Sequence, residues 1–545
     1  MSKQPFLLKT LEECRIGFPI LPGPVMKAFY WATFLFLLLN SLLLVGILVP
    51  NDGLLSFVLD DPFIHLRLAE NIWLGHYGIN LSEASAPSSS IIWPYVLSPF
   101  AGLVFAPWLL LLLNILMGVG LIYFVAACLA INFSALSSQL LTAVLFSFVL
   151  LANLPSLVFV GMEHVLQVLL TVIIVYGLLD FLCKTENSHT TRLKYWFWLA
   201  LFLSPLVRYE NSLLVGCVLL FLFVQGFYWP SLLTGLFIAF VLLSFSGYLY
   251  SLGLGWLPTS ILLKSSADLP LLEKLANKVN GLIVTPKAWL LMLALGLFIR
   301  IIFSKRAQLE RQLAACFALF TLLFLCLGSF GWYYRYEVFA WISVALVLLY
   351  LYRKLAMDFI SRGSKQRKLA VLLILFLSIE HIFVTLLVPV AANNIYLQQY
   401  QMGRFVRDFY QAPVAVNDIG WVAYIGEQRT LDLWGLASQT AMNLRLSSDK
   451  QDGEWMQSLV ESSDVGLAMI YFDDQGDADG WFESVPVSWQ RLGSLTMQAG
   501  GVSVSKREVV FFSTNTEAHK RAVDSLALFA PTLPELARFE VYTRY

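Results

Sequence analysis

Apolar stretches long enough to cross a lipid bilayer recur along this chain of 545 residues. A membrane-crossing helix needs about 20 mostly apolar residues, and the first such stretch runs from Ala28 to Pro50. Hydrophobic residues make up 58% of the chain and charged residues 13%, whereas soluble globular proteins carry about a quarter charged residues. The sequence therefore predicts an α-helical polytopic membrane protein. A formal net charge of zero argues against nucleic acid as a partner, which would call for a basic surface.

We expect about eleven membrane-spanning helices. After the first, the predicted spans are Leu109–Ile131, Gln139–Phe159, Val165–Cys183, Tyr195–Val207, Leu213–Tyr228, Leu232–Leu252, Ala288–Phe303, Leu313–Gly328, Val338–Tyr352 and Leu369–Val390. The apolar stretch Ile91–Phe105 is interrupted by Pro94 and Pro99. Because proline breaks helices, we expect this stretch to be a juxtamembrane or re-entrant element within the first external loop, residues 51–107.

The loop charges predict the orientation of the chain. Loops rich in Lys and Arg remain in the cytoplasm, and the most basic loop holds Arg353, Lys354, Arg362, Lys365, Arg367 and Lys368. This rule keeps the N-terminus cytoplasmic. It places the first external loop and the polar C-terminal third on the opposite side of the membrane.

Two adjacent carboxylates, Asp60 and Asp61, directly follow the first span. Pro62 suits the first position of a helix, which predicts Asp61 as the N-cap, bonded to the free amides of the first turn. Asp60 then stands just outside the helix and is not used by it. This pair is where the sequence predicts a general base, with Asp60 in that role.

An ordered set of short motifs resembles the GT-C superfamily of integral membrane glycosyltransferases, and within it bacterial mannosyl- and arabinofuranosyltransferase-like members. The motifs are Asp60-Asp61 before Leu66-Arg67-Leu68-Ala69, Ser88–Trp93, Gly161-Met162-Glu163, Arg208-Tyr209-Glu210, Trp256–Ser260 running to Lys264, and in the C-terminal third Val414–Gly420 and Leu431–Leu436. The chain departs from the family pattern at Tyr209, where such proteins often have proline, and at Thr259, where they often have asparagine. The resemblance implies a glycosyltransferase of the bacterial inner membrane, with a transmembrane domain over residues 1–392 and a periplasmic α/β domain over residues 393–545.

The implied reaction moves a sugar from a polyprenyl-phosphate donor to an extracytoplasmic glycan, lipid or protein, with inversion at the anomeric carbon. A sugar phosphate has a good leaving group, so the site needs a base for the acceptor hydroxyl and cations for the departing phosphate. No cofactor is required, and a divalent metal is not favoured, because His65 lies one turn after Asp61 with no third ligand nearby. The partners expected are the lipid-linked donor, the acceptor and the bilayer.

Four cations on the external side are candidates for binding the donor phosphate: Arg335, Lys264, Arg208 and Arg67. Each has a plainer alternative. Arg67 can form an ion pair with Glu70, and Arg208 can extend to the membrane interface. Arg335 can belong to an aromatic interfacial belt, and Lys264 can be a solvated loop lysine. Three further side chains are expected to bind sugar or acceptor groups: Glu163, His65 and Glu210.

The alternative function is a polytopic transporter or a flippase for a lipid-linked sugar. A transporter usually has an internal repeat and places ionisable residues at mid-membrane, whereas here the ionisable residues collect at one face. In the C-terminal third, short strand-like runs at Pro413–Val416, Val465–Phe472 and Glu508–Ser513 alternate with helical patterns, which predicts a small α/β domain. Its acidic stretch Asp473–Asp479 lacks the closing glutamate of a calcium loop, so we expect a solvated turn there.

Overall fold

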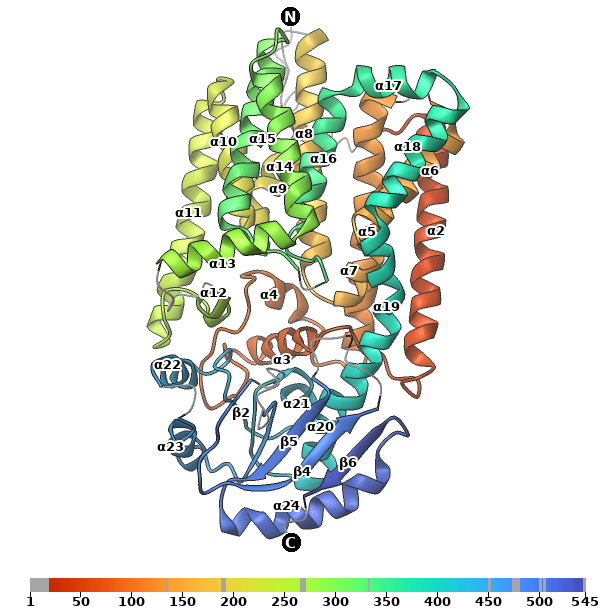
Figure 1. The fold of residues 1–545 in the computed structure, drawn as a ribbon. Helices are drawn as coiled ribbons and strands as arrows, with labels where there is room; N and C mark the ends of the chain where they lie inside the picture. Colours follow the sequence, from red (N-terminus) through yellow and green to blue (C-terminus); the bar gives the residue numbers. More distant parts are fainter. Residues whose placement is uncertain are drawn as a thin grey trace, which may run out of the picture.

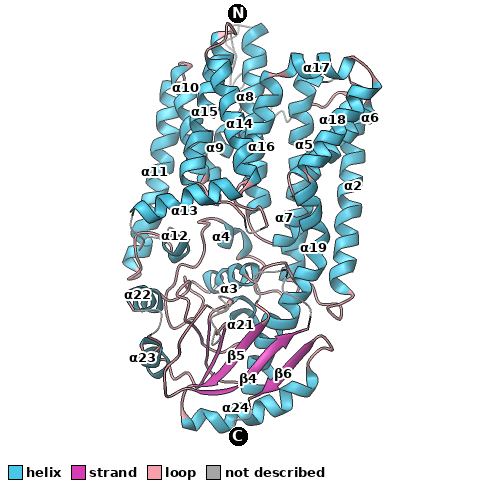
Figure 2. Ribbon diagram, in the orientation of Figure 1, coloured by secondary structure: helices cyan, strands magenta, loops and turns pink. Residues whose placement is uncertain are grey.

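The structure is a computed structural model that describes residues 19–133, 136–187, 193–264, 271–331, 333–448, 452–472, 481–498, 502 and 506–542. A bundle of long helices forms one end of the molecule, and a sheet flanked by helices forms the other (Figures 1 and 2).

Helices occupy all of the apolar stretches predicted to span the membrane. They are α2 (Gly23–Leu48), α5 (Ala106–Phe133), α6 (Ser138–Leu151), α7 (Leu154–Val160), α8 (His164–Asn187), α9 (Tyr195–Val207), α10 (Asn211–Val224), α11 (Tyr228–Ser251), α14 (Pro286–Ile302), α15 (Gln308–Leu327), α16 (Val338–Leu351), α18 (Ser364–Leu377) and α19 (Ile379–Ile395). Within the described residues, 6 helices are long and apolar enough to cross a membrane, or up to 9 if each bent pair is one span. The multi-pass class is confirmed, and the number of crossings stays a prediction.

The outer surface of the bundle is apolar where a soluble protein would be polar. Along α11, large side chains are exposed at Leu232, Leu233, Leu236, Phe237, Phe240 and Leu243. A contiguous apolar surface of this kind is not tolerated in water. Lipid therefore covers this face of the bundle.

The stretch Ile91–Phe105 does not cross the bundle, as predicted. It contains only the short helix α4 (Trp93–Leu97), followed by turns. The amides of Ile91 and Ile92 donate to the carbonyl of Leu206 at the end of α9. These bonds attach the segment 51–107 to the end of the bundle that faces the sheet.

Four further helices lie at the two ends of the bundle. Between the bundle and the sheet lie α3 (Asp61–Trp73), α12 (Thr259–Lys264) and α13 (Leu271–Val284), whereas α17 (Arg353–Ser361) lies at the opposite end of the bundle (Figure 1). The segment 51–107, which includes α3 and α4, thus lies between the two parts of the molecule.

The C-terminal region is a six-stranded mixed sheet with strand order β2-β1-β3-β5-β4-β6. Its strands are β1 (Val414–Val416), β2 (Thr430–Asp432), β3 (Leu467–Ile470), β4 (Gln490–Met497), β5 (Glu508–Ser513) and β6 (Ala537–Val541). The pairs β1–β2 and β1–β3 are parallel, and the remaining pairs are antiparallel. The predicted α/β class of this region is confirmed.

Alternate residues of the sheet pack on opposite faces, as the two-residue period of a strand requires. On β5, Phe511 contributes to the core that includes Phe529 of α24 (Thr516–Phe529), and Phe512 contributes to the core that includes Met456 of α23 (Trp455–Ser462). The other helices of this region are α21 (Gly420–Ile425), α22 (Gln439–Ser447) and the short η3 (Ala530–Thr532).

One long helix joins the bundle to the sheet. It runs from Ile379 to Tyr410 through α19, the π-helical turn η1 (Tyr396–Tyr400), α20 (Gln401–Phe405) and a second π-helical turn, η2 (Val406–Tyr410). A continuous helix transmits its orientation along its length, so the two parts are not joined by a flexible linker.

The position of the basic loop allows the predicted orientation to be tested. Ser364 is the first residue of α18 and lies beside α17, at the end of the bundle far from the sheet (Figure 1). Ser447 is the last residue of α22, near the sheet. Both side chains are exposed. In a variant without native cysteines, we expect Ser447→Cys, but not Ser364→Cys, to react with a membrane-impermeant thiol reagent added outside intact cells. Labelling of Ser364→Cys alone would reverse the orientation, and labelling of both from outside would contradict a membrane-crossing bundle.

Candidate functional site

Helix α3 begins one residue earlier than the sequence predicts. Asp60 is the N-cap residue and Asp61 lies in the first turn, with Pro62 behind it. The Asp60 side chain makes no capping hydrogen bond to this turn. The prediction that Asp61 is the capping residue is therefore wrong, and both carboxylates have other partners.

The Asp60 side chain is committed to the C-terminal region. It is 1% exposed, and its two carboxylate oxygens accept hydrogen bonds from the backbone amides of Gly420 and Trp421, the latter at 2.8 Å. These amides begin α21, so Asp60 caps a helix 360 residues away in the sequence. The prediction that α3 does not use the Asp60 side chain is confirmed, and the side chain is bound instead by the first turn of α21.

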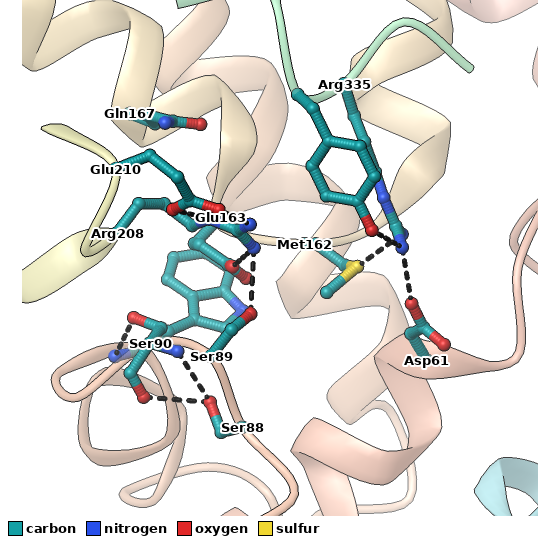
Figure 3. A network of polar contacts seen from close by, with 12 residues as sticks. Asp61, Ser88, Ser89, Ser90, Met162, Glu163, Gln167, Arg208, Glu210 and Arg335 are labelled. Carbon is teal, nitrogen blue, oxygen red and sulfur yellow. Dashed lines mark hydrogen bonds and ion pairs between the residues drawn. The ribbon is translucent and has the colours of Figure 1, made fainter. Parts of the chain in front are cut away.

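Asp61 instead faces a buried arginine across the site. Its Oδ2 lies 2.9 Å from a terminal nitrogen of Arg335; the arginine side chain is 4% exposed and that of Asp61 is 35% exposed. Arg335 also donates to the Tyr336 hydroxyl and to the Met162 sulfur, each at 3.0 Å (Figure 3). The structure thus pairs a partly accessible carboxylate with a buried, well-held guanidinium.

The turn that presents Arg335 is strained. Tyr333 and Tyr334 have φ angles of 63° and 58°, a left-handed conformation that is unfavourable for bulky residues. The Asn153 side chain stabilises the turn by donating to the Tyr333 carbonyl at 2.7 Å. Strain of this kind persists only where surrounding contacts enforce it, and it is concentrated at functional sites.

A second buried arginine lies on the other side of the site. Arg208, 1% exposed, donates to Glu163 and to Ser89, each at 2.8 Å, and forms two bonds with Glu210 at 2.7 and 3.1 Å (Figure 3). The alternative in which Arg208 extends to the membrane interface is excluded by this burial. The guanidinium is held by two carboxylates, which offset its charge.

Tyr336 lies between the two arginines. Its ring centre is 5.6 Å from the guanidinium carbon of Arg208 and 5.1 Å from that of Arg335. His65 approaches the same cluster, with its Nε2 3.9 Å from Glu163 and its Nδ1 3.4 Å from the Ser88 hydroxyl. Six predicted site residues are therefore brought together: Asp61, Arg335, Arg208, Glu163, Glu210 and His65.

Two of the predicted phosphate-binding cations are not shown in the cluster. Arg67 bonds to Glu70 at 3.1 Å and to the Ile79 carbonyl at 3.3 Å, so the ion-pair alternative describes it correctly. Lys264 ends α12, but its side chain lies outside the described residues, as does the stretch Asp473–Asp479. Among the residues that the structure describes, no three His, Cys, Asp or Glu side chains are grouped as metal ligands.

Sequence reasoning missed two contributors to this region. Tyr336 was not among the predicted site residues, although its position directly after Arg335 was a usable signal. The hydrogen bond from the Gly420 amide to Asp60 could not be found from sequence. Neither segment has a local sequence pattern that indicates its contact with the other.

Comparison with known proteins gives a partial picture. Residues 393–512 match a family described as a domain of unknown function (DUF8728). None of the curated proteins matches the chain.

Among solved structures, the chain is similar to the oligosaccharyltransferase of Archaeoglobus fulgidus. With an acceptor peptide tethered to that enzyme, the TM-score is 0.44 at 12% identity, covering 80% of this chain and 69% of the other. The AglB structure from the same organism, in complex with an inhibitory peptide and a dolichol-phosphate, also gives 0.44 at 12% identity, covering 94% and 76%. A TM-score of this size carries no argument about the chemistry of this chain, which has to come from the site itself.

Proposed function

We propose that this protein is an integral membrane glycosyltransferase that moves a sugar from a polyprenyl-phosphate donor to an extracytoplasmic glycan, lipid or protein. The observation that carries the proposal is the Asp61–Arg335 pair at 2.9 Å, at the junction of the apolar bundle and the C-terminal region. A lipid-phosphate donor places its phosphate where a bilayer ends, and the end of the apolar bundle is where such a boundary is expected.

The two side chains match the two needs of the reaction. Arg335 offers planar, charged donors that suit a phosphate, and the charge it stabilises grows as the bond between the anomeric carbon and the phosphate oxygen breaks. The acceptor hydroxyl oxygen attacks the anomeric carbon from the opposite face, and Asp61 takes its proton. The products are the glycosylated acceptor with inverted configuration, the polyprenyl phosphate and a protonated Asp61, which returns its proton to water.

This assignment exchanges the roles that the sequence suggested for the two aspartates. Asp60 is buried and both of its oxygens are occupied by amides, whereas Asp61 is partly accessible and faces the site. A base must reach the proton that it removes. Asp61 meets this requirement and is the proposed base.

The Arg208 cluster has a supporting role in this proposal. Because Glu163 and Glu210 both bind Arg208, its positive charge is already offset, which makes it a weak phosphate ligand. Because Glu163 and His65 are 0% and 3% exposed, we assign them to holding Arg208 in place and not to sugar hydroxyls. The bacterial inner membrane, with the C-terminal region in the periplasm, is the proposed location.

Replacement of Arg335 tests the donor end of the proposal. Lysine keeps the charge but loses the two-pronged geometry, so we expect Arg335→Lys to raise the KM for a polyprenyl-phosphate sugar about ten-fold, since hydrogen bonds to charged groups contribute about 1.5–3 kcal/mol. The assay is transfer in proteoliposomes with a panel of such donors. Arg404→Lys, at an arginine of α20 that contacts Phe529 away from the site, is the matched control. An unchanged donor KM in Arg335→Lys would move the phosphate site elsewhere.

The same proteoliposomes separate the alternative function. A transporter or flippase would move the labelled lipid-linked sugar between leaflets without forming a glycosylated product. A glycosyltransferase consumes the donor only when an acceptor is present. If the labelled donor moved between leaflets at the same rate in Asp61→Asn as in wild type, the transporter or flippase would be favoured.

A further inference from the structure

The C-terminal region is bonded closely to the start of α3. The backbone amides of Gly420 and Trp421 donate to the two carboxylate oxygens of Asp60. Phe63 of α3 stacks on Trp421, with ring centres 3.7 Å apart. A Cβ atom added to Gly420 would overlap the Asp60 carboxyl group and backbone oxygen. Glycine therefore permits α21 to approach the start of α3 within hydrogen-bonding distance.

A second contact joins the segment 51–107 to the edge of the sheet. The Asn80 side chain donates to the Thr430 carbonyl at 2.9 Å, and its oxygen accepts from the Thr430 amide at 3.0 Å. Thr430 belongs to β2, the strand at one edge of the sheet. An edge strand leaves backbone donors and acceptors open, and the Asn80 side chain offers the donor and acceptor that a further strand would supply. The C-terminal region is thus docked on this segment at two separate places.

The C-terminal region also contacts the turn that presents Arg335. The Tyr333 hydroxyl donates to the carbonyl of Val502, between β4 and β5, at 3.2 Å. Tyr333 lies two residues before Arg335 and has a left-handed backbone, which persists only where surrounding contacts enforce it. The same region therefore holds the residue directly before Asp61 and a residue close to Arg335.

The bundle holds the start of α3 from its other side. The Val58 amide donates to the Phe159 carbonyl of α7 at 3.0 Å. The backbone that carries Asp61 is thus fixed by the bundle through Val58 and by the C-terminal region through Asp60. The distance of 2.9 Å between Asp61 and Arg335 depends on both attachments.

We propose that the C-terminal region is a clamp that sets the spacing of Asp61 and Arg335, with Asp60 and Tyr333 as positioning residues on its two sides. Each positioning residue acts through the neighbour that it holds. A displacement of about 1 Å at a reacting group costs about 10²-fold in rate, so a loosened clamp slows the reaction with both reacting side chains still present. This inference rests on the proposed roles of Asp61 and Arg335, whereas the contacts that form the clamp do not.

Asp60→Asn tests one side of the clamp. The new amide nitrogen faces a backbone amide of α21, and two donors cannot bond to each other. We expect the backbone amides of α21 and of the first two turns of α3 to exchange hydrogen at least about ten-fold faster, measured on the full-length protein in nanodiscs. Asp408→Asn, in an exposed pair with Arg407, is the matched control. If Asp60→Asn fails to fold, Gly420→Ala disturbs the same contact with the aspartate intact.

Tyr333→Phe tests the other side and removes only a hydroxyl. We expect the backbone amides of residues 333–335 to exchange about five-fold faster, the usual effect of losing one neutral hydrogen bond. The amides of α21 should exchange as in wild type, because the Asp60 contact is intact. Tyr30→Phe, at an exposed tyrosine of α2, is the matched control.

Transfer kinetics give a second readout that differs between the two sides. Asp60→Asn displaces the proposed base, so kcat should fall about 10²-fold with little change in the donor KM. Tyr333→Phe displaces the proposed phosphate ligand, so it should raise the donor KM more than it lowers kcat. Rates are expressed per donor-binding site, so a loss of folded protein does not count as a loss of kcat.

Hydrogen exchange does not depend on transfer, which separates failure of the clamp from failure of the proposed function. Unchanged exchange in the first two turns of α3 in Asp60→Asn, or at residues 333–335 in Tyr333→Phe, would overturn the clamp. The expected exchange together with wild-type kinetics in both variants would instead contradict the roles proposed for Asp61 and Arg335.

Discussion

Asp61→Asn is expected to reduce transfer by about 10²–10⁴-fold, the usual cost of losing a general base. Asparagine has nearly the same size, so it can still accept a hydrogen bond from Arg335, but it cannot take the proton of the acceptor hydroxyl. Donor binding should change little, because the phosphate is assigned to Arg335. The measurement is single-turnover transfer in proteoliposomes, alongside binding of the labelled donor.

A carboxylate on the same helix provides the control. Glu70 lies on α3 and pairs with Arg67 away from the site, so Glu70→Gln should transfer at close to the wild-type rate. If Asp61→Asn turned over as fast as Glu70→Gln, Asp61 would not be the base. If Asp60→Asn were inactive while the backbone amides of α21 stayed protected from hydrogen exchange, Asp60 would be the general base, as the sequence suggested.

Removal of Arg208 should have the largest effect on stability. The Arg208 and Glu163 side chains are 1% and 0% exposed, and removing one partner of a buried ion pair leaves an uncompensated charge, which costs about 3–5 kcal/mol. In Arg208→Met, Glu163 and Glu210 both lose their bonds to the guanidinium. We expect a clear fall in the midpoint of thermal unfolding, measured in detergent, together with loss of activity.

Arg67→Met is the matched control for this substitution. The Arg67–Glu70 pair is 23% and 19% exposed, and accessible pairs contribute about 0–1 kcal/mol. Its unfolding midpoint should stay near that of wild type. Equal destabilisation by the two substitutions would contradict the burial and pairing described for Arg208.

The bundle could be predicted from sequence because bilayer-spanning helices have a strong local signature. Runs of about 20 apolar residues and the proline-broken Ile91–Phe105 stretch are read without knowledge of distant contacts. The C-terminal strands were also local patterns, and β1, β3 and β5 lie where they were predicted. The orientation in the membrane and the boundary at residue 393 stay predictions.

The sequence predicted most of the residues that form the site, but not the separate roles of Asp60 and Asp61. The Arg-x-Glu, Gly-Met-Glu and Asp-Asp motifs supplied most of the residues that meet around Tyr336. The roles of Asp60 and Asp61 depended on which carboxylate α21 engages, and that contact joins residues 360 positions apart. Local capping rules favoured Asp61, because within α3 alone Pro62 marks the start of a helix.

Density for a bound carrier lipid tests the central claim most directly. We would determine a cryo-electron microscopy map of the protein in nanodiscs containing polyprenyl phosphate, the carrier without its sugar. The account expects the phosphate within hydrogen-bonding distance of the Arg335 guanidinium, with the Asp61 carboxylate facing the space where the sugar and acceptor meet. A phosphate bound at another place, with Arg335 still paired only to Asp61, Tyr336 and Met162, would contradict it.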